Sequence, residues 1–323
     1  MSLRKTIREH YSRLPWWKKA PLRVARLGVL FSVFMVASQS AQIFPGALAS
    51  LISGKTENRK LPQGVESIFV DTADGETLEA WRLDVVPKCG ESGANFDPKP
   101  DSSGSEKHER STASITECTH SRKTAIVFHG NGGDVQNFFV YQQYFQRIGV
   151  RSYGFDYRGF GNSSGWPSEE GLYRDADAIV EYVKSREQLT ADDLVLVGIS
   201  VGTGPAAYAA AKHGVGALVL FSPFRSLLQL VKEMTFVGFL HPFLLFEFPV
   251  EQYVAALERT CLVVVHGKVD TVIPFSHGEQ VAAAYQGTRA SAFLPSESAG
   301  HNDILFKTAT ALPPILAQCD IRD

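Results

Sequence analysis

The stretch Asp193-Leu-Val-Leu-Val-Gly-Ile-Ser-Val-Gly202 decides the fold. It joins the apolar, β-branched run Leu194–Val197, typical of a buried strand, to the helix-forming run Val201–Lys212. Between these runs, Gly198–Gly202 reads G-x-S-x-G. A sharp turn in this context holds the serine in a strained backbone conformation, with its Oγ above the end of the sheet. The pattern predicts that Ser200 is a nucleophile, but the same pattern also occurs in ordinary strand-to-helix turns.

A serine hydroxyl is a poor nucleophile near neutral pH, so it needs a general base and an acid that orients the base. For a serine on such a turn, the acid and then the base follow later in the chain. Asp270 is the only acid in the segment Gly267–Pro274, which follows an apolar, strand-like run. An Asx-type turn would explain the same aspartate without catalysis. We expect Asp270 to be the orienting acid.

Two histidines lie well downstream of Ser200 in loop-like settings. His277 is expected at the start of a helix, whereas His301 lies in the loop Ser298–Asp303 after the strand expected at residues 290–294. The loop after the last strand is the expected place for the general base, although a surface-loop histidine would look the same. We expect His301 to take the proton of the nucleophile.

The oxyanion of an acyl-transfer reaction needs two backbone donors. One is expected to be the N–H of Val201, the residue after the nucleophile. The other is expected from the loop His129-Gly-Asn-Gly-Gly-Asp134, which follows the strand-like run Thr124–Phe128 and whose glycines let amides approach a ligand. The N–H of Asn131 is our choice for this second donor. A phosphate cradle is the alternative, but the loop lacks the lysine and the spacing of the phosphate-binding motifs.

Strand-like and helix-like patterns alternate from Thr124 onward, which indicates a mostly parallel sheet covered on both faces. Two alternating runs, Glu66–Asp71 and Thr77–Asp84, with a turn at Ala73-Asp-Gly75, predict a preceding β-hairpin. The expected strands are 124–128, 150–155, 193–198, 216–221, 261–266 and 290–294. The expected helices are 134–148, 170–188, 201–213, 276–286 and 303–318.

Several of these motifs together resemble the α/β-hydrolase superfamily, and more narrowly the membrane-anchored α/β-hydrolase-domain proteins and their bacterial relatives. The matching stretches are His129–Gly133, Asp156-Tyr-Arg-Gly-Phe-Gly-Asn-Ser-Ser-Gly165, Ser168-Glu-Glu-Gly-Leu-Tyr173, Gly198–Gly202, Gly267–Pro274 and Gly300-His-Asn302. The resemblance implies an α/β-hydrolase fold and the hydrolysis of esters or thioesters, and it implies no metal or organic cofactor. The chain departs from the family at Val201, where leucine is common, and in the long segment 87–122.

The N-terminal part of the chain has its own composition. Residues 1–26 carry eight Lys or Arg and one acid, and no residue of 27–54 is charged. The length of the uncharged run suffices to cross a bilayer, so we expect a basic N-terminal segment followed by a transmembrane signal anchor. By the positive-inside rule the hydrolase domain would lie on the non-cytoplasmic side. A cleaved signal peptide and an interfacial helix with Trp16 and Trp17 remain alternatives.

The hydrolase domain is expected over 60–323, with a polar and disordered insertion at 88–123. The net charge of −2 argues against a nucleic-acid partner. Cys261 is expected to be a buried thiol, and Cys89 and Cys118 could form a disulfide in an oxidising compartment. Arg158 is expected to pair with a carboxylate.

The Phe- and Leu-rich segment 236–249 is expected either to pack on the sheet as a short cap or to form an apolar wall for an acyl chain. The sequence thus predicts a membrane-tethered serine hydrolase that acts on a small-molecule or acylated-protein substrate. A serine peptidase of the prolyl-peptidase type and a non-catalytic membrane-tethered binding module are the alternatives.

Overall fold

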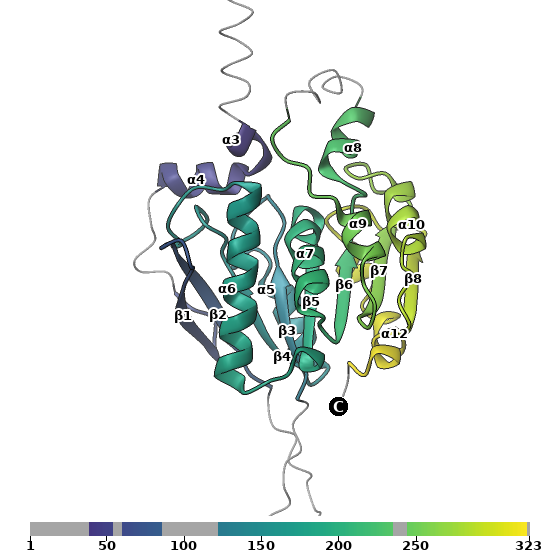
Figure 1. The fold of residues 1–323 in the computed structure, drawn as a ribbon, viewed down its shortest axis with the longest axis horizontal. Helices are drawn as coiled ribbons and strands as arrows, with labels where there is room; N and C mark the ends of the chain where they lie inside the picture. Colours follow the sequence, from purple (N-terminus) through teal and green to yellow (C-terminus); the bar gives the residue numbers. More distant parts are fainter. Residues whose placement is uncertain (1–38, 54–59, 86–121, 235–243, 322–323) are drawn as a thin grey trace, which may run out of the picture.

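The computed structural model describes residues 39–53, 60–85, 122–234 and 244–321. In these ranges one sheet has the strand order β1-β2-β4-β3-β5-β6-β7-β8 (Figure 1). The strands are β1 (Val65–Asp71), β2 (Thr77–Leu83), β3 (Thr124–Phe128), β4 (Arg151–Phe155), β5 (Leu194–Ile199), β6 (Ala217–Phe221), β7 (Cys261–Gly267) and β8 (Ser291–Ser296). Strand β2 pairs antiparallel with β1 and β4, and all other pairs are parallel. The predicted mostly parallel sheet and its leading hairpin are confirmed.

Strand β5 carries Ser200 at its carboxyl end and is buried on both faces. Its alternate residues belong to two different hydrophobic cores: Leu194 and Leu196 to one, Val195 and Val197 to the other. This division follows because successive side chains of a strand point to opposite faces of the sheet. The continuous apolar run that suggested a buried strand therefore reflects helices on both sides.

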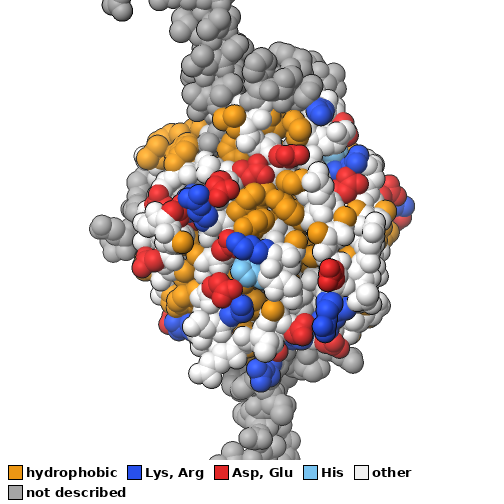
Figure 2. Space-filling model, in the orientation of Figure 1, with side chains coloured by type: hydrophobic (Ala, Val, Ile, Leu, Met, Phe, Trp, Pro, Cys, Tyr) orange, Lys and Arg blue, Asp and Glu red, His pale blue; other side chains and the backbone are white. Residues whose placement is uncertain are grey.

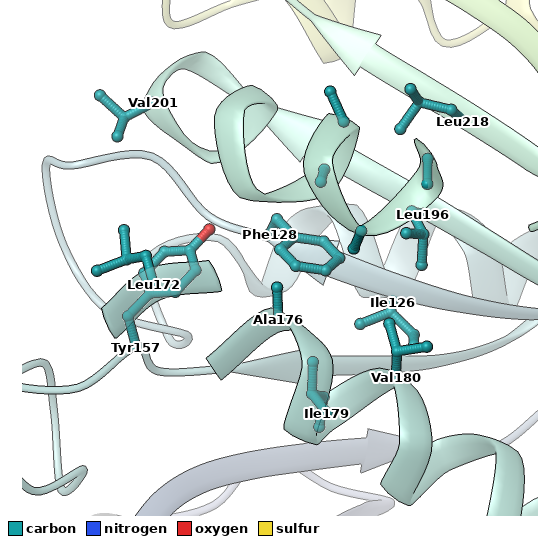
Figure 3. Close-up of a cluster of buried hydrophobic side chains, with 14 of the residues drawn as sticks. Ile126, Phe128, Tyr157, Leu172, Ala176, Ile179, Val180, Leu196, Val201 and Leu218 are labelled. Atoms are coloured by element: carbon teal, nitrogen blue, oxygen red, sulfur yellow. The ribbon is translucent and has the colours of Figure 1, made fainter. Parts of the chain in front are cut away.

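Two sets of helices cover the two faces of the sheet. The first core includes side chains of α6 (Glu169–Glu187), α7 (Thr203–His213), α9 (Val250–Ala255) and α10 (Phe275–Ala283). The second includes side chains of α5 (Phe139–Arg147), α11 (Ile304–Thr308) and α12 (Leu312–Leu316). Figure 3 shows how Ile179 and Val180 of α6 lie beside Ile126 of β3 in the first core. Ser168 caps α6, since its Oγ accepts a hydrogen bond from the Gly171 N–H (3.0 Å).

Two predicted helices differ from the structure. The helix expected at 134–148 begins only at Phe139, because Asp134 forms a turn whose carboxylate accepts the Gln136 N–H. The helix expected at 303–318 is divided into α11 and α12. Pro313 and Pro314 lie at the start of α12, where proline's missing N–H costs least.

The uncharged N-terminal run does not have the structure expected over its whole length. Residues 27–38 lie outside the described part of the chain, but α3 (Gln39–Ile43) and α4 (Pro45–Ser53) are short helices placed against the hydrolase domain. Phe44 and Ala47 are buried in its first core. Residues 39–53 therefore belong to the globular domain, which begins before the predicted residue 60. No helix within the described ranges is long and apolar enough to cross a bilayer.

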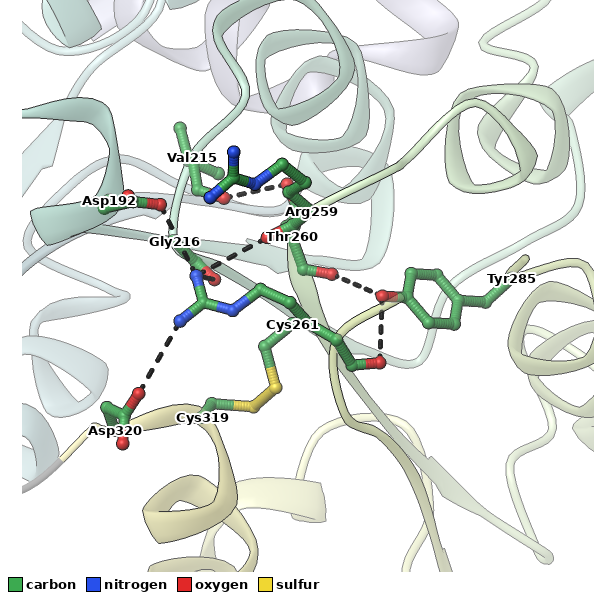
Figure 4. The surroundings of a disulfide bond; sticks show 10 residues. Asp192, Val215, Gly216, Arg259, Thr260, Cys261, Tyr285, Cys319 and Asp320 are labelled. Atoms are coloured by element: carbon green, nitrogen blue, oxygen red, sulfur yellow. Dashed lines mark hydrogen bonds and ion pairs between the residues drawn. A yellow bond between two sulfur atoms is a disulfide. The ribbon is translucent and has the colours of Figure 1, made fainter. Parts of the chain in front are cut away.

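The prediction of a free thiol at Cys261 is wrong. Cys261 is buried at the start of β7, as expected, but it forms a disulfide with Cys319, and their Cα atoms are 5.5 Å apart (Figure 4). The bond attaches the C-terminal segment to the sheet across a sequence separation of 58. Beside it, Tyr285 donates a hydrogen bond to the carbonyl oxygen of Thr260 (2.8 Å). The insertion 88–123 with Cys89 and Cys118 falls almost wholly outside the described residues.

Candidate active site

Ser200 lies at the turn between β5 and α7. Its φ is +52°, a left-handed conformation that is uncommon for a residue with a side chain. Thr203 stabilises the turn, because its Oγ1 donates a hydrogen bond to the carbonyl oxygen of Ser200 (2.6 Å). Backbone strain of this kind is typical of functional positions that the surrounding structure holds in place.

The two glycines of the pentapeptide are required by close contacts. A Cβ on Gly202 would lie 2.2 Å from the carbonyl oxygen of Phe128 and 2.5 Å from that of His129. A Cβ on Gly198 would lie 2.8 Å from the Cα of Thr203. All these neighbours are backbone atoms, which cannot rotate away as a side chain would. The absence of side chains thus lets the turn press against the end of β3.

The structure brings together the three residues expected to form the triad. His301 Nε2 lies 3.0 Å from Ser200 Oγ, and His301 Nδ1 lies 2.8 Å from Asp270 Oδ2. Ser200 follows β5, Asp270 follows β7 and His301 follows β8, so the carboxyl ends of three strands contribute one residue each. This arrangement suits a tautomer in which His301 donates through Nδ1 to the carboxylate and accepts through Nε2 from the hydroxyl.

Asp270 is held as an ionised acceptor. Its Oδ1 accepts hydrogen bonds from the backbone N–H groups of Val272 (2.8 Å) and Ile273 (2.9 Å). Burial alone would raise the pKa of Asp270, but the hydrogen bonds from His301 and these two amides lower the pKa below its usual value. The side chain therefore stays charged near neutral pH and favours the orientation of His301 that Ser200 requires.

The loop with Asn131 lies against the Ser200 turn. A Cβ on Gly130 would be 3.5 Å from the carbonyl oxygen of Ile199, and Gly202 touches the backbone of Phe128 and His129. The two segments expected to supply the oxyanion donors, the N–H groups of Asn131 and Val201, are therefore neighbours. Their donor roles remain a prediction.

His129, at the start of this loop, is a buried neutral base. Its Nδ1 donates to the carbonyl oxygen of Gly130 (2.7 Å), and its ring packs against Tyr157, with ring centroids 4.4 Å apart. Burial lowers the pKa of His129 to about 4. This side chain thus shapes the loop and stays uncharged near neutral pH.

His266 is a residue near the triad that the sequence analysis did not single out. It is buried at the end of β7, donates through Nε2 to the carbonyl oxygen of Ile273 (3.0 Å) and lies 3.5 Å from Asp270 Oδ2. It therefore supports the turn that presents Asp270. Its signal in the sequence was the pair His266-Gly267 at a strand end, which repeats the pair His129-Gly130.

His277, the histidine not chosen as the base, forms its hydrogen bonds with residues outside the Ser200–His301–Asp270 chain. It is buried in α10, where Nδ1 accepts the Arg225 N–H (3.1 Å) and Nε2 donates to Glu233 (2.9 Å). These contacts connect α10 to the end of α8 (Leu227–Glu233).

The predicted pairing of Arg158 with a carboxylate is confirmed. Arg158 donates through Nε to the buried Asp175 (2.9 Å) and through its terminal nitrogens to Asp74. Burial raises the pKa of Asp175 to about 6, against the opposing effect of Arg158. The network connects the segment after β4 to α6 and to the turn of the β1–β2 hairpin.

The described end of the cap segment packs as core. Phe246 and Phe248 are 4% and 0% exposed and stack on each other, and Phe246 also contacts Phe44. These two rings favour the packing alternative over an open acyl wall. Residues 235–243 of the cap lie outside the described part of the chain.

One hollow of the described surface lies far from the Ser200 edge of the sheet. A hollow of about 490 Å³ lies at the opposite edge of the sheet, lined by Thr190, Gly214 and Thr260 near the amino ends of β5, β6 and β7. In the described ranges, no group of three or more His, Cys, Asp or Glu residues is placed to hold a metal ion.

Comparisons with known proteins give a consistent result. A sequence model of the family described as "alpha/beta hydrolase fold" matches residues 124–260. Alpha/beta hydrolase domain-containing protein 17C of Mus musculus is 35% identical over 185 residues, which are 57% of this chain and 56% of that protein. The 17B protein of Xenopus laevis is 31% identical over 190 residues, 58% of this chain and 63% of that protein. The chain thus spans under two thirds of the length of these relatives.

Solved structures share the fold at low identity. An alpha-beta hydrolase from Vibrio vulnificus has a TM-score of 0.59 and 18% identity, covering 87% of this chain and 92% of that one. The Pyrococcus furiosus esterase Pf2001 has a TM-score of 0.53 and 16% identity, covering 83% of this chain and 96% of that one.

Proposed function

Since this chain belongs to the α/β-hydrolase superfamily, we propose that it is a serine hydrolase that cleaves carboxylic esters or thioesters of lipid-like or acylated substrates. The fold and the relatives support the hydrolase class. The observation that supports the chemistry is the hydrogen-bonded chain from Ser200 Oγ through His301 to Asp270, with distances of 3.0 and 2.8 Å.

The proposed reaction proceeds through an acyl-enzyme. Ser200 Oγ attacks the carbonyl carbon while its proton passes to His301 Nε2, and the carbonyl π pair moves to oxygen. The oxyanion pair then re-forms the carbonyl, the C–O or C–S bond to the leaving group breaks, and His301 gives that proton to the departing alcohol or thiol. In the second half, His301 takes a proton from water, the hydroxide attacks the acyl carbon, and the proton returns to Ser200 as the acid leaves. Asp270 stays ionised and stabilises the imidazolium.

The oxyanion formed in both halves needs fixed donors. The N–H groups of Asn131 and Val201 are proposed for this role, because their two segments lie against each other next to Ser200. In related chemistry, one such donor contributes about 3 kcal/mol to transition-state stabilisation.

Exposed apolar side chains at this edge of the sheet favour an apolar substrate. Val269 and Val272, which flank Asp270, are 53% and 54% exposed, and Leu245 of the cap is 65% exposed. Covering these water-exposed apolar side chains with an acyl chain lowers the free energy, which favours binding of such a substrate.

A location on the non-cytoplasmic side of a membrane is proposed for the catalytic domain. The basic residues of 1–26 favour a cytoplasmic N-terminus, and the Cys261–Cys319 disulfide suits an oxidising compartment. A protease added outside sealed, right-side-out vesicles should digest the domain. Full protection there would contradict this placement.

The nucleophile is tested with a p-nitrophenyl ester and a fluorophosphonate probe. The wild type should turn over the ester and be labelled, whereas Ser200→Ala should do neither. Ser222→Ala is the matched control, because Ser222 also follows a strand, is buried and has a positive φ of 47°. Labelling that persists in Ser200→Ala would remove the assignment.

A further inference from the structure

The α3–α4 corner, residues 43–46, binds Asn131, the residue proposed as the second oxyanion donor. Asn131 Nδ2 donates a hydrogen bond to the carbonyl oxygen of Ile43 (3.0 Å), across 88 residues of sequence. The Gly46 N–H donates in turn to the carbonyl oxygen of Asn131 (3.2 Å). Asn131 is thus bound to the corner through both its side chain and its backbone.

These two hydrogen bonds satisfy polar backbone groups at the end of one helix and the start of the next. The last carbonyl of a helix and its first N–H groups have no partner within their own helix. Ile43 ends α3, and Gly46 lies in the first turn of α4. A carbonyl oxygen only accepts hydrogen bonds, so it selects an amide side chain that presents its NH₂ group.

The corner is also fixed by packing. Phe44 is 1% exposed and contacts the rings of Phe160 and Phe246 edge to face, with centroids 6.1 and 5.4 Å apart. A Cβ on Gly46 would lie 2.7 Å from the ring of Phe160 and 3.0 Å from the carbonyl oxygen of Asn131. The corner and the loop therefore meet without spare room.

We propose that the α3–α4 corner is a positioning element of the active site, which sets the direction of the Asn131 N–H. Holding the side chain and the carbonyl of Asn131 limits rotation about its N–Cα bond, so the N–H points to one place. This inference rests on the proposed acyl-transfer function. It makes residues 39–53, the second half of the uncharged N-terminal run, a part of the catalytic unit.

Two variants of the full chain test this role with a soluble p-nitrophenyl ester. Asn131→Ala removes the bond to Ile43, and Gly46→Ala forces the corner away from the loop. Both should lower kcat by roughly tenfold with little change in KM, since a misplaced oxyanion donor acts on the transition state. Ser50→Ala is the control on α4: its Oγ accepts the Gly161 N–H (3.0 Å) and donates to the carbonyl oxygen of Gly46 (3.0 Å), so its loss loosens α4 but removes neither hydrogen bond of Asn131.

The outcomes separate three cases. A wild type that neither turns over the ester nor reacts with fluorophosphonate contradicts the proposed function itself. An active wild type with unchanged kcat in Asn131→Ala and Gly46→Ala overturns the positioning role. An equal loss of kcat in Ser50→Ala also overturns it, because the effect would then come from general loosening of α4. Thermal unfolding of each variant shows that it is folded.

A different observation concerns the outer face of α4. Leu48, Leu51 and Ile52 lie at helical spacing and are 37%, 68% and 77% exposed. Trp166, 42% exposed, lines the same hollow of about 310 Å³ as Leu51. Figure 2 shows apolar side chains gathered over α4 at the upper left of the molecule. The sequences of α3 and α4 contain no charged residue.

The chain itself indicates what covers this face. Gln39 of α3 follows directly on the uncharged residues 27–38, which follow a segment with eight Lys or Arg. Apolar surface next to basic residues is the composition that binds an anionic lipid surface. We infer that Leu48, Leu51, Ile52 and Trp166 enter the lipid interface and place the Ser200 edge of the sheet near the bilayer.

Fluorescence in vesicles tests this contact. The full chain is reconstituted into phosphatidylcholine–phosphatidylglycerol vesicles with or without brominated acyl chains. The difference between wild type and Trp166→Phe isolates the emission of Trp166, since both proteins keep the other three tryptophans. Brominated lipid should quench that emission. Emission that brominated lipid leaves unchanged overturns the inference.

Activity gives a second readout. The double change Leu51→Ser and Ile52→Ser should lower turnover of a vesicle-embedded ester several-fold and leave turnover of a soluble ester unchanged. Phe69→Ser is the control, because Phe69 is 58% exposed but lies on β1. Equal effects of both variants overturn the inference. Light scattering gives a further outcome. If the wild type is a dimer and the double variant is not, the inference is overturned, because the face would then bind a second copy of the chain.

Discussion

His301 Nε2 lies 3.0 Å from Ser200 Oγ, although 101 residues of sequence separate the two. Strands β6, β7 and β8 lie between them in the chain, and parallel pairing brings the carboxyl ends of all these strands to one edge. His301 therefore reaches Ser200 through the sheet topology. Asp270 holds the other ring nitrogen of His301, so the orientation of His301 depends on this carboxylate.

Asp270→Asn should lower kcat by about 10⁴ with the fold retained. An asparagine of the same shape can present its NH₂ group to His301, which favours the tautomer that cannot accept the Ser200 proton. Ester turnover and circular dichroism of the variant measure the two effects. Activity within tenfold of the wild type would show that Asp270 is not the orienting acid.

Gly202→Ala should remove activity, because the new Cβ would lie 2.2 Å from a backbone oxygen of β3 and push the Ser200 turn away from it. Gly214→Ala is the matched control. Gly214 ends α7 with φ +62° and open space around it, so its change should cost about 1 kcal/mol of stability and leave kcat intact. Similar kcat losses in both would refute the steric argument.

The contribution of His129 to stability should fall as the pH is lowered from 6.5 to 4, whereas Asp175, whose pKa is raised to about 6, should act in the opposite direction within this range. The folded state keeps His129 neutral, with a pKa of about 4, whereas the unfolded chain binds a proton near pH 6.5. At this side chain the unfolded state thus binds more protons in this window, so His129 by itself lowers the free energy of unfolding by roughly 3 kcal/mol as the pH falls through it.

Urea unfolding at several pH values measures this dependence. The free energy of unfolding of His129→Phe should rise relative to that of the wild type as the pH falls from 6.5 to 4, because the variant lacks the group that the folded state keeps neutral. Tyr157→Phe should keep the slope, because it removes only the hydrogen bond of Tyr157 to the carbonyl oxygen of His129 (3.1 Å). An unchanged slope in His129→Phe would assign the effect to other groups.

Cys319→Ser should lower the free energy of unfolding by about 2–4 kcal/mol, because the unfolded chain gains the freedom that the bond to Cys261 removes. A reducing agent should destabilise the wild type by the same amount and leave Cys319→Ser unaffected. If reduction destabilises both proteins equally, the effect comes from another bond.

Local sequence patterns determined much of this protein. The run Leu194–Val197 with the following G-x-S-x-G predicted the strand, the turn and the helix, because burial on both faces and a crowded turn each restrict the residue types allowed. The positions of Asp270 and His301 after later strands could also be predicted, since parallel strands present their carboxyl ends at one edge.

Only the tertiary structure decided how distant segments meet. The bond of Asn131 to Ile43 and the disulfide of Cys261 with Cys319 join residues whose local sequences give no sign of each other. The same holds for residues 39–53: their apolar composition suited a membrane span, but the core of the domain offers Phe44 an equally apolar environment. Hydrophobicity determines that a side chain leaves water, and packing geometry determines where it goes.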